Sequence, residues 1–250
     1  MERGLEARWA RVDRPRQVTE ARQAADTLRG ESVVVIGRGS GTARAVALLA
    51  HSRGARVVVA GRDKIGLRSD YGGTDIDTEA VDITDDESIA RLATRTGPVD
   101  HVVATAAAWA GLRLADLERH DLRKSFDINI IGSMMLAKHF ARQIKPGGSF
   151  VLFSGVHTVK LDAASIGTGG AVDLLIRWLA AELAPIRVNA VSPAITAGTY
   201  GVRQCHEHHD HRNLLHRHGT SVDIAGVVLF AMTTKFMTGM TLKVDEGLQI

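Results

Sequence analysis

Residues Val33 to Ala47 read VVVIGRGSGTARAVA, and this stretch decides the fold that we expect for the whole chain. Its β-branched apolar start suits a buried strand with both faces covered. Gly37, Gly39 and Gly41 follow, and a helical run begins at Ala43. Glycine lets a backbone approach an anion closely, and the N-terminus of a helix presents free N–H groups and positive charge. The stretch therefore predicts a phosphate-binding unit.

The spacing of the glycines distinguishes between two known phosphate-binding patterns. A GxGxxG fingerprint would need a glycine at position 42, which is Thr42, whereas a GxxxGx(G/A) pattern fits Gly37, Gly41 and Ala43. A glycine turn alone is also compatible with a plain strand-to-helix corner. The rest of the chain has to separate these two interpretations.

The second strand is expected at residues 55–60 (ARVVVA), and Gly61, Arg62 and Asp63 follow it. In a dinucleotide-binding fold, the end of this strand meets the adenosine ribose, where an acid accepts from the 2′-hydroxyl and an arginine accommodates a 2′-phosphate. Asp63 is better placed to cap the next helix. Arg62, together with Arg38 of the glycine turn, therefore favours NADP over NAD.

Five further strands are expected at residues 78–83, 100–104, 149–153, 186–191 and 239–244. Four helices are expected between them: one capped by Thr84 and beginning at Asp85, one over 113–143 broken near Gly132, one over 171–184 and one over 223–232. Strands that alternate with helices, without repeats or linkers, predict one α/β domain with a doubly wound parallel sheet.

Composition excludes several classes of protein. The chain has 250 residues, of which 45% are hydrophobic and 24% charged, with a net charge of +3, as in an ordinary single globular domain. The sequence has no basic tract with interleaved aromatic residues, which would indicate nucleic-acid binding, and no apolar run long enough to span a membrane. Cys205 is the only cysteine, so we expect no intrachain disulfide and a cytoplasmic location. Residues 1–30 are interpreted as a polar extension and residues 31–250 as the folded domain.

Several motifs, in their order and spacing, resemble those of the short-chain dehydrogenase/reductase family. The similar stretches are Gly37-xxx-Gly41-x-Ala43, Val81-Asp82-Ile83, Asp100 to Ala107, Phe126-Asp127-Ile128-Asn129, Arg187 to Ala194, Thr238-Gly239 and Val244 to Gly247. The resemblance covers nearly the whole chain, from about Val33 to Gly247. It implies a Rossmann-like fold with a seven-stranded parallel sheet, and an NADP(H)-dependent oxidoreductase acting on a carbonyl/alcohol pair of a small molecule.

The resemblance also implies which residues bind the cofactor. In this family an aspartate at the position of Asp82 holds the adenine. The expected cofactor-binding residues are Gly37, Arg38, Ser40, Gly41, Thr42, Arg62, Asp82, Ile83, Thr105, Ala106, Pro193 and Ile195.

The expected active site departs from the family pattern. The YxxxK motif of the family falls on Ser165 and Gly169, and its serine position falls on Gly155, just after Ser154. Asn129 is the one catalytic position that is kept. Because a serine hydroxyl without a nearby ammonium is a very weak acid, losing the usual proton donor costs about 10²–10⁴-fold in rate.

Replacement chemistry has few candidates near these positions. His157 lies two residues beyond the serine position and is a candidate acid or base, although a loop histidine is often only solvated. Water and the substrate itself are the other proton sources left open. The catalytic candidates are Asn129, Ser154, His157 and Ser165. The cluster at residues 206–211 (HEHHDH) falls in the segment that forms the substrate lid in this family, and it matches no zinc motif, so we expect no metal site.

Two other functions remain open at this point: a non-redox enzyme (an isomerase, lyase or cyclase) on the same scaffold, and a catalytically silent NADP-binding protein. We also expect a homotetramer or homodimer, because the helix expected at 171–184 carries more apolar residues than one sheet face can cover: Leu174, Leu175, Trp178 and Leu179.

Overall fold

The computed structural model describes residues 27–108, 114–154, 163–194 and 214–247; of residue 114 and residues 163–168 only the backbone is described. Seven strands form one sheet in the order β3-β2-β1-β4-β5-β6-β7, and every neighbouring pair is parallel. The strands are β1 (Ser32–Ile36), β2 (Arg56–Gly61), β3 (Asp77–Ala80), β4 (Val99–Ala104), β5 (Ile144–Phe153), β6 (Arg187–Pro193) and β7 (Thr241–Val244).

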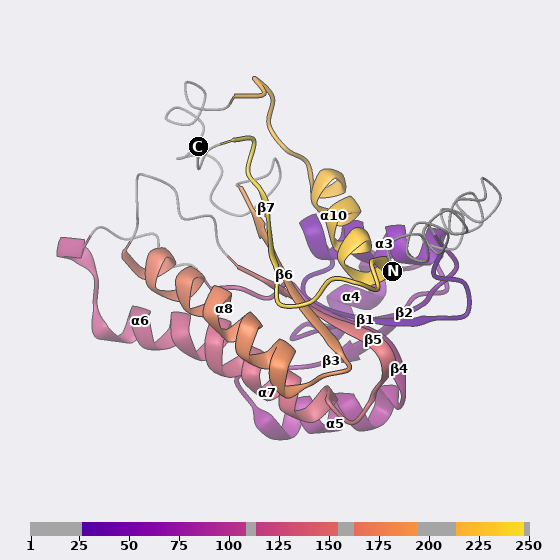
Figure 1. The fold of residues 1–250 in the computed structure, drawn as a ribbon. Coiled ribbons are helices and arrows are strands. Elements are labelled where there is room, and N and C mark those ends of the chain that lie inside the picture. Colours follow the sequence, from indigo (N-terminus) through magenta and orange to yellow (C-terminus); the bar gives the residue numbers. More distant parts are fainter. Residues whose placement is uncertain (1–26, 109–113, 155–162, 195–213, 248–250) are drawn as a thin grey trace, which may run out of the picture.

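Helices cover both faces of this sheet (Figure 1). One face carries α3 (Gly41–Ser52), α4 (Lys64–Asp70) and α10 (Ser221–Thr233). The other carries α5 (Asp86–Thr96), α7 (Gly132–Phe140) and α8 (Ala163–Glu182), with the 3₁₀ turn η1 (Leu114–Asp116), α6 (Arg119–Phe126) and the π-helical η2 (Asp127–Ile131) preceding α7. The expected single α/β domain with a doubly wound, seven-stranded parallel sheet is confirmed.

The apolar run that opens β1 is explained by these two layers. Val33 and Val35 belong to the core under α3 and α10, whereas Val34 and Ile36 belong to the core under α5, α7 and α8. Successive side chains of a strand point to opposite faces, so a strand buried on both faces needs an uninterrupted apolar sequence.

The third strand and the helix after it differ from expectation. β3 ends at Ala80 rather than at residue 83, although the amide of Val81 still donates to the carbonyl of Gly61. The N-cap of α5 is Asp85, which accepts from the amide of Glu87 at 3.0 Å, and not Thr84. The hydroxyl of Thr84 does not cap the helix but donates to the carboxylate of Asp82.

The two helices that flank the expected active site also differ. The helix expected over 113–143 begins only at Arg119, changes to a π-helical turn over Asp127–Ile131 and ends at Phe140. α8 begins at Ala163, eight residues before the expected start at 171. The glycines at 167, 169 and 170 therefore lie inside a helix, since packing against the sheet outweighs their poor helix propensity.

The described packing begins before the expected domain boundary at residue 31. Leu28 is fully buried in the core under α3, and its amide donates to the carbonyl of Arg53 at 3.0 Å. The polar extension remains a prediction for residues 1–26, which lie outside the described residues. In the described parts of the chain, no helix is long and apolar enough to cross a membrane.

A row of polar side chains crosses the amino end of the sheet beneath α10. His101, Ser149 and Arg187 are register neighbours on β4, β5 and β6. The ring of His101 is hydrogen-bonded through Nε2 to the Glu31 carboxylate and through Nδ1 to Ser149 Oγ, each at 2.8 Å. Arg187 donates to the carbonyl of Ala231 near the end of α10 at 2.9 Å. Arg187 thereby joins α10 to the amino ends of the strands, which lie opposite the expected cofactor site.

Candidate cofactor and active site

The carboxyl ends of the strands meet at one edge of the sheet, because all the strands are parallel (Figure 1). The strand order reverses between β1 and β4, and ligands of open α/β sheets bind at such a switch point. Hydrogen bonds continue past the strand ends here: Gly37 donates to Ala60 at 2.9 Å and Thr105 donates to Ile36 at 2.9 Å. The segments after β1 and β4 are therefore held in register where the sequence places the cofactor.

The glycines of this edge are required by close packing. A Cβ atom on Gly37 would lie 2.7 Å from the Cβ of Ala43, and one on Gly61 would lie 2.5 Å from the carbonyl oxygen of Gly37. Gly41 has a φ of +59°, which an L side chain rarely adopts, and it leads the chain into α3. The glycine turn and the end of β2 are thus packed against each other.

The N-terminus of α3 differs from those of three other helices. Ser40, its N-cap, makes no capping hydrogen bond through its side chain, and the first turn contains no acidic residue. By contrast, α4, α5 and α10 are capped by Asp63, Asp85 and Thr220. Within the described residues, the first turn of α3 thus has no capping side chain for its free N–H groups. These groups fit a diphosphate anion.

Charged residues lie where the adenosine end of a dinucleotide is expected. Asp82 follows β3, and its Oδ1 accepts hydrogen bonds from the amide of Thr84 at 3.0 Å and from its hydroxyl at 2.7 Å. These two bonds, with a smaller contribution from the positive charge of Arg62, lower the pKa of Asp82 below its usual value. Arg62 and Arg38 are both exposed. The residues after β2 and β3 thus bring the guanidinium of Arg62 close enough to act on the carboxylate of Asp82.

Asn129 holds the segment after β4. Its Oδ1 accepts from the amide of Ala108 at 3.0 Å, and its Nδ2 donates to the carbonyl of Ala108 at 2.9 Å and to Ser125 Oγ at 3.2 Å. The side chain projects from η2, and π-helical turns are frequent at functional sites. These contacts make Asn129 a positioning residue for the small residues after Thr105; its catalytic role stays a prediction.

The remaining catalytic and cofactor candidates are only partly described. Ser154 follows β5, is buried, and donates its backbone N–H to the carbonyl of Val191 at 3.0 Å. Ser165 and Gly169 lie one turn apart on α8, and of Ser165 only the helical backbone is described. Pro193 ends β6. Gly155, His157, Ile195 and the segment 206–211 lie outside the described residues.

Two contacts near the site were missed by the sequence analysis. Ser125 lies one helical turn before Asn129, and both side chains bond Ala108. The four-residue spacing of the two polar residues is a sequence signal for this contact. Gly132 packs against the segment that follows β3: a Cβ there would lie 3.0 Å from the carbonyl oxygen of Ile83. No local signal indicates this second contact, because residues 49 positions apart in the sequence form it.

Comparisons with known proteins agree with this geometry. A family model described as enoyl-(acyl carrier protein) reductase matches residues 36–249. The chain is 32% identical to a short-chain dehydrogenase/reductase of Acremonium sp (91% of this chain, 98% of that protein) and 30% identical to L-xylulose reductase of Homo sapiens (88% and 97%). A solved short-chain dehydrogenase/reductase from Brucella melitensis superposes with a TM-score of 0.84 at 26% identity (90% and 98%). The chain belongs to the short-chain dehydrogenase/reductase family.

Proposed function

We propose that this protein is a cytoplasmic, NADP(H)-dependent oxidoreductase that acts on a carbonyl/alcohol pair of a small molecule and uses a non-standard proton donor. The observation that carries the proposal is the N-terminus of α3, where Ser40 makes no capping hydrogen bond and the first turn has no acidic residue of its own. Arg62 directly follows Gly61, which packs on the glycine turn. Family membership supports oxidoreductase chemistry, and relatives such as L-xylulose reductase bear reductase names.

The cofactor, when bound, supplies or accepts the hydride. Backbone N–H groups of the turn and of the first turn of α3 bind its diphosphate, and the exposed guanidinium groups favour a 2′-phosphate. Asp82 and Ile83 hold the adenine, and small residues after β4 leave room for the nicotinamide. The residues assigned to the cofactor are those expected from the sequence: Gly37, Arg38, Ser40, Gly41, Thr42, Arg62, Asp82, Ile83, Thr105, Ala106, Pro193 and Ile195.

The proton step needs a different donor from the family's usual tyrosine. Neither Ser165 nor Gly169 supplies a phenol or an ammonium group. We assign the proton to His157, with Ser154 and Ser165 as hydroxyl groups that orient the substrate, because an imidazole exchanges protons near neutral pH and a serine hydroxyl does not.

Two measurements test this function in sequence. Calorimetric titration should show binding of NADP(H), with NAD(H) binding more weakly; a protein that binds neither dinucleotide contradicts the proposal. Purified protein should then consume NADPH with members of a ketone panel. Product formation without net change in the cofactor would instead identify a non-redox isomerase, lyase or cyclase, and binding without any turnover would identify a silent NADP-binding protein.

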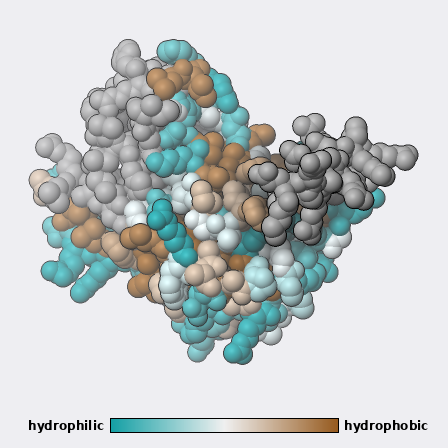
Figure 2. Space-filling view, viewed as in Figure 1, coloured by the Kyte–Doolittle hydropathy of each residue, from teal (hydrophilic) through white to brown (hydrophobic). Residues whose placement is uncertain are grey.

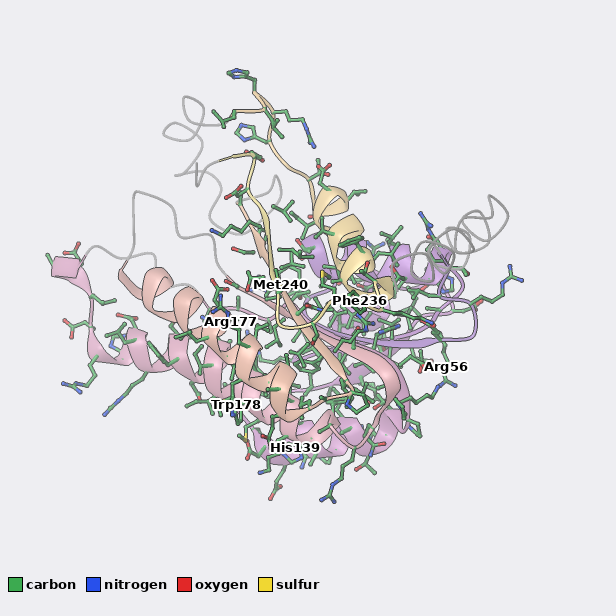
Figure 3. The ribbon with its side chains drawn as sticks, viewed as in Figure 1. Arg56, His139, Arg177, Trp178, Phe236 and Met240 are labelled. Carbon is green, nitrogen blue, oxygen red and sulfur yellow. The ribbon has the colours of Figure 1, made fainter. Side chains whose placement is uncertain are left out.

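We further infer that the protein is a homodimer or homotetramer that assembles through α8. Leu175 and Leu179 are buried in the domain's own core, but Leu174 and Trp178, one turn apart, are 69% and 51% exposed. Apolar side chains reach the surface over α8 in Figure 2, and Figure 3 shows Trp178 on this helix. A second copy of the helix would cover both residues. Light scattering at micromolar concentration tests this, and a monomer contradicts it.

A further inference from the structure

The last residue of α4 packs against the glycine turn. A Cβ atom on Gly39 would lie 2.7 Å from the carboxyl carbon of Asp70, so this carboxylate sits directly on the backbone of the turn. Asp70 is exposed, although residues 39 and 70 are far apart in the sequence. A negative charge is therefore placed next to the positive end of α3.

Arg44 of α3 holds Asp70 in this position. Its Nη1 donates to the backbone carbonyl of Asp70, and its guanidinium lies 5.2 Å from the centroid of the Tyr71 ring. The Tyr71 ring is buried, and this burial raises the pKa of its hydroxyl to about 12, so the ring stays neutral beneath the cation. The other end of α4 is fixed by its cap, Asp63, which accepts from the amide of Gly66 at 2.9 Å.

The position of Asp70 bears on the adenosine end of the proposed site. Gly61, at the end of β2, packs on Gly37, so Arg62 and the glycine turn border the same space. A carboxylate at this border repels a dianionic 2′-phosphate, whereas it can accept a hydrogen bond from a 2′-hydroxyl.

On the basis of the proposed cofactor site, we propose that Asp70 is a specificity-determining residue that limits the preference of this protein for NADP(H) over NAD(H). Arg62 and Asp70 then act as a pair of opposite charges on the same substituent of the cofactor. The ratio of the dissociation constants for NADP(H) and NAD(H) measures the net effect of the two charges.

Asp70→Asn tests the proposal, because the amide keeps the shape of the side chain and removes its charge. Calorimetry at low ionic strength should show the affinity for NADP⁺ relative to NAD⁺ rising by about three- to tenfold. Asp77→Asn is the matched control: it removes one exposed carboxylate at the amino end of β3 and should leave the ratio unchanged.

Two further measurements separate charge from structural damage. Asp70→Ser removes the charge and also the bulk against Gly39, and it should shift the ratio in the same direction as Asp70→Asn. Added salt should reduce the difference between the wild type and both variants, because it screens exposed charges. Folded variants that bind NADP⁺ with the wild-type ratio would overturn the inference and leave the proposed function intact. A wild-type protein that binds neither dinucleotide would overturn both.

Discussion

The sequence predicts that the two halves of the sheet's carboxyl edge differ in how much of the family pattern they keep. The half formed by the ends of β1 to β4 keeps the glycine turn, Asp82 and the uncapped helix, whereas the half formed by β5 and α8 has Ser165 and Gly169 at the expected tyrosine and lysine positions. In the proposed function, the first half binds the diphosphate mainly through backbone groups, which are also part of the fold. The second half would depend on particular side chains of α8, and replacing such side chains need not disrupt the helix that carries them.

The largest effect is expected in the second half. His157→Ala should lower kcat by about 10²–10⁴-fold once a substrate is known, because it removes the proposed proton donor. Ser165→Ala removes only a hydroxyl group assigned to substrate orientation and should cost far less than His157→Ala. The wild-type rate should depend on pH near 6–7, where an unperturbed imidazole titrates. A large loss for Ser165→Ala with none for His157→Ala would show that the roles are reversed.

Gly37→Ala should weaken both folding and cofactor binding, because in the half formed by β1 to β4 the same backbone serves both. The added methyl group would lie 2.7 Å from the Cβ of Ala43, so the turn must shift. We expect the free energy of unfolding to fall by about 1–3 kcal/mol and NADP(H) binding to weaken. Gly226→Ala in α10, where the added methyl group meets no atom within 4 Å, is the control for the substitution itself. Urea unfolding and calorimetry provide both readouts, and unchanged values for Gly37→Ala would contradict this account.

Arg62→Ala sharpens the comparison by altering a side chain of the first half without altering its packing. Loss of a charge-assisted contact to a 2′-phosphate should weaken NADP(H) binding by about tenfold and leave NAD(H) binding nearly unchanged. Calorimetric titration of both cofactors measures the change in preference. An unchanged preference would exclude Arg62 as the phosphate ligand.

The smallest effect is expected at the opposite, amino edge of the sheet. The hydrogen bond from His101 lowers the pKa of Glu31, so ionised Glu31 stabilises the fold above its ordinary pKa of 4.5, and this stabilisation is lost as the pH falls through the lower folded value. Because 37% of the Glu31 side chain is exposed, Glu31→Gln should cost less than about 1 kcal/mol at pH 7. Urea unfolding at pH 7 and below pH 4 should show the difference between the two proteins shrinking in acid. Glu31→Gln should leave the cofactor affinity unchanged. A changed affinity would show that the amino ends of the strands affect the cofactor site at their carboxyl ends.

Local patterns explain which parts of this molecule could be predicted. The apolar run of β1, the glycines that follow it and the cap of α4 by Asp63 each depend on residues close in the sequence, and all three are present as expected. α8 begins earlier than its sequence predicts, because its glycines disfavour a helix that only packing stabilises. The cap of α5 was assigned one residue early, since Thr84 and Asp85 are both good capping residues and the contact with Asp82 decides between them.

The sequence by itself determined the order of strands and helices, the family and the position of the glycine turn, because periodicity, turn residues and motif spacing act over a few residues. Only the tertiary structure decided what those residues touch. It places Asp70 on Gly39, Asn129 on Ala108 and Arg187 on the end of α10, and each contact joins segments at least 21 positions apart. Such pairs are set by how the layers pack on the sheet, which local propensity does not encode.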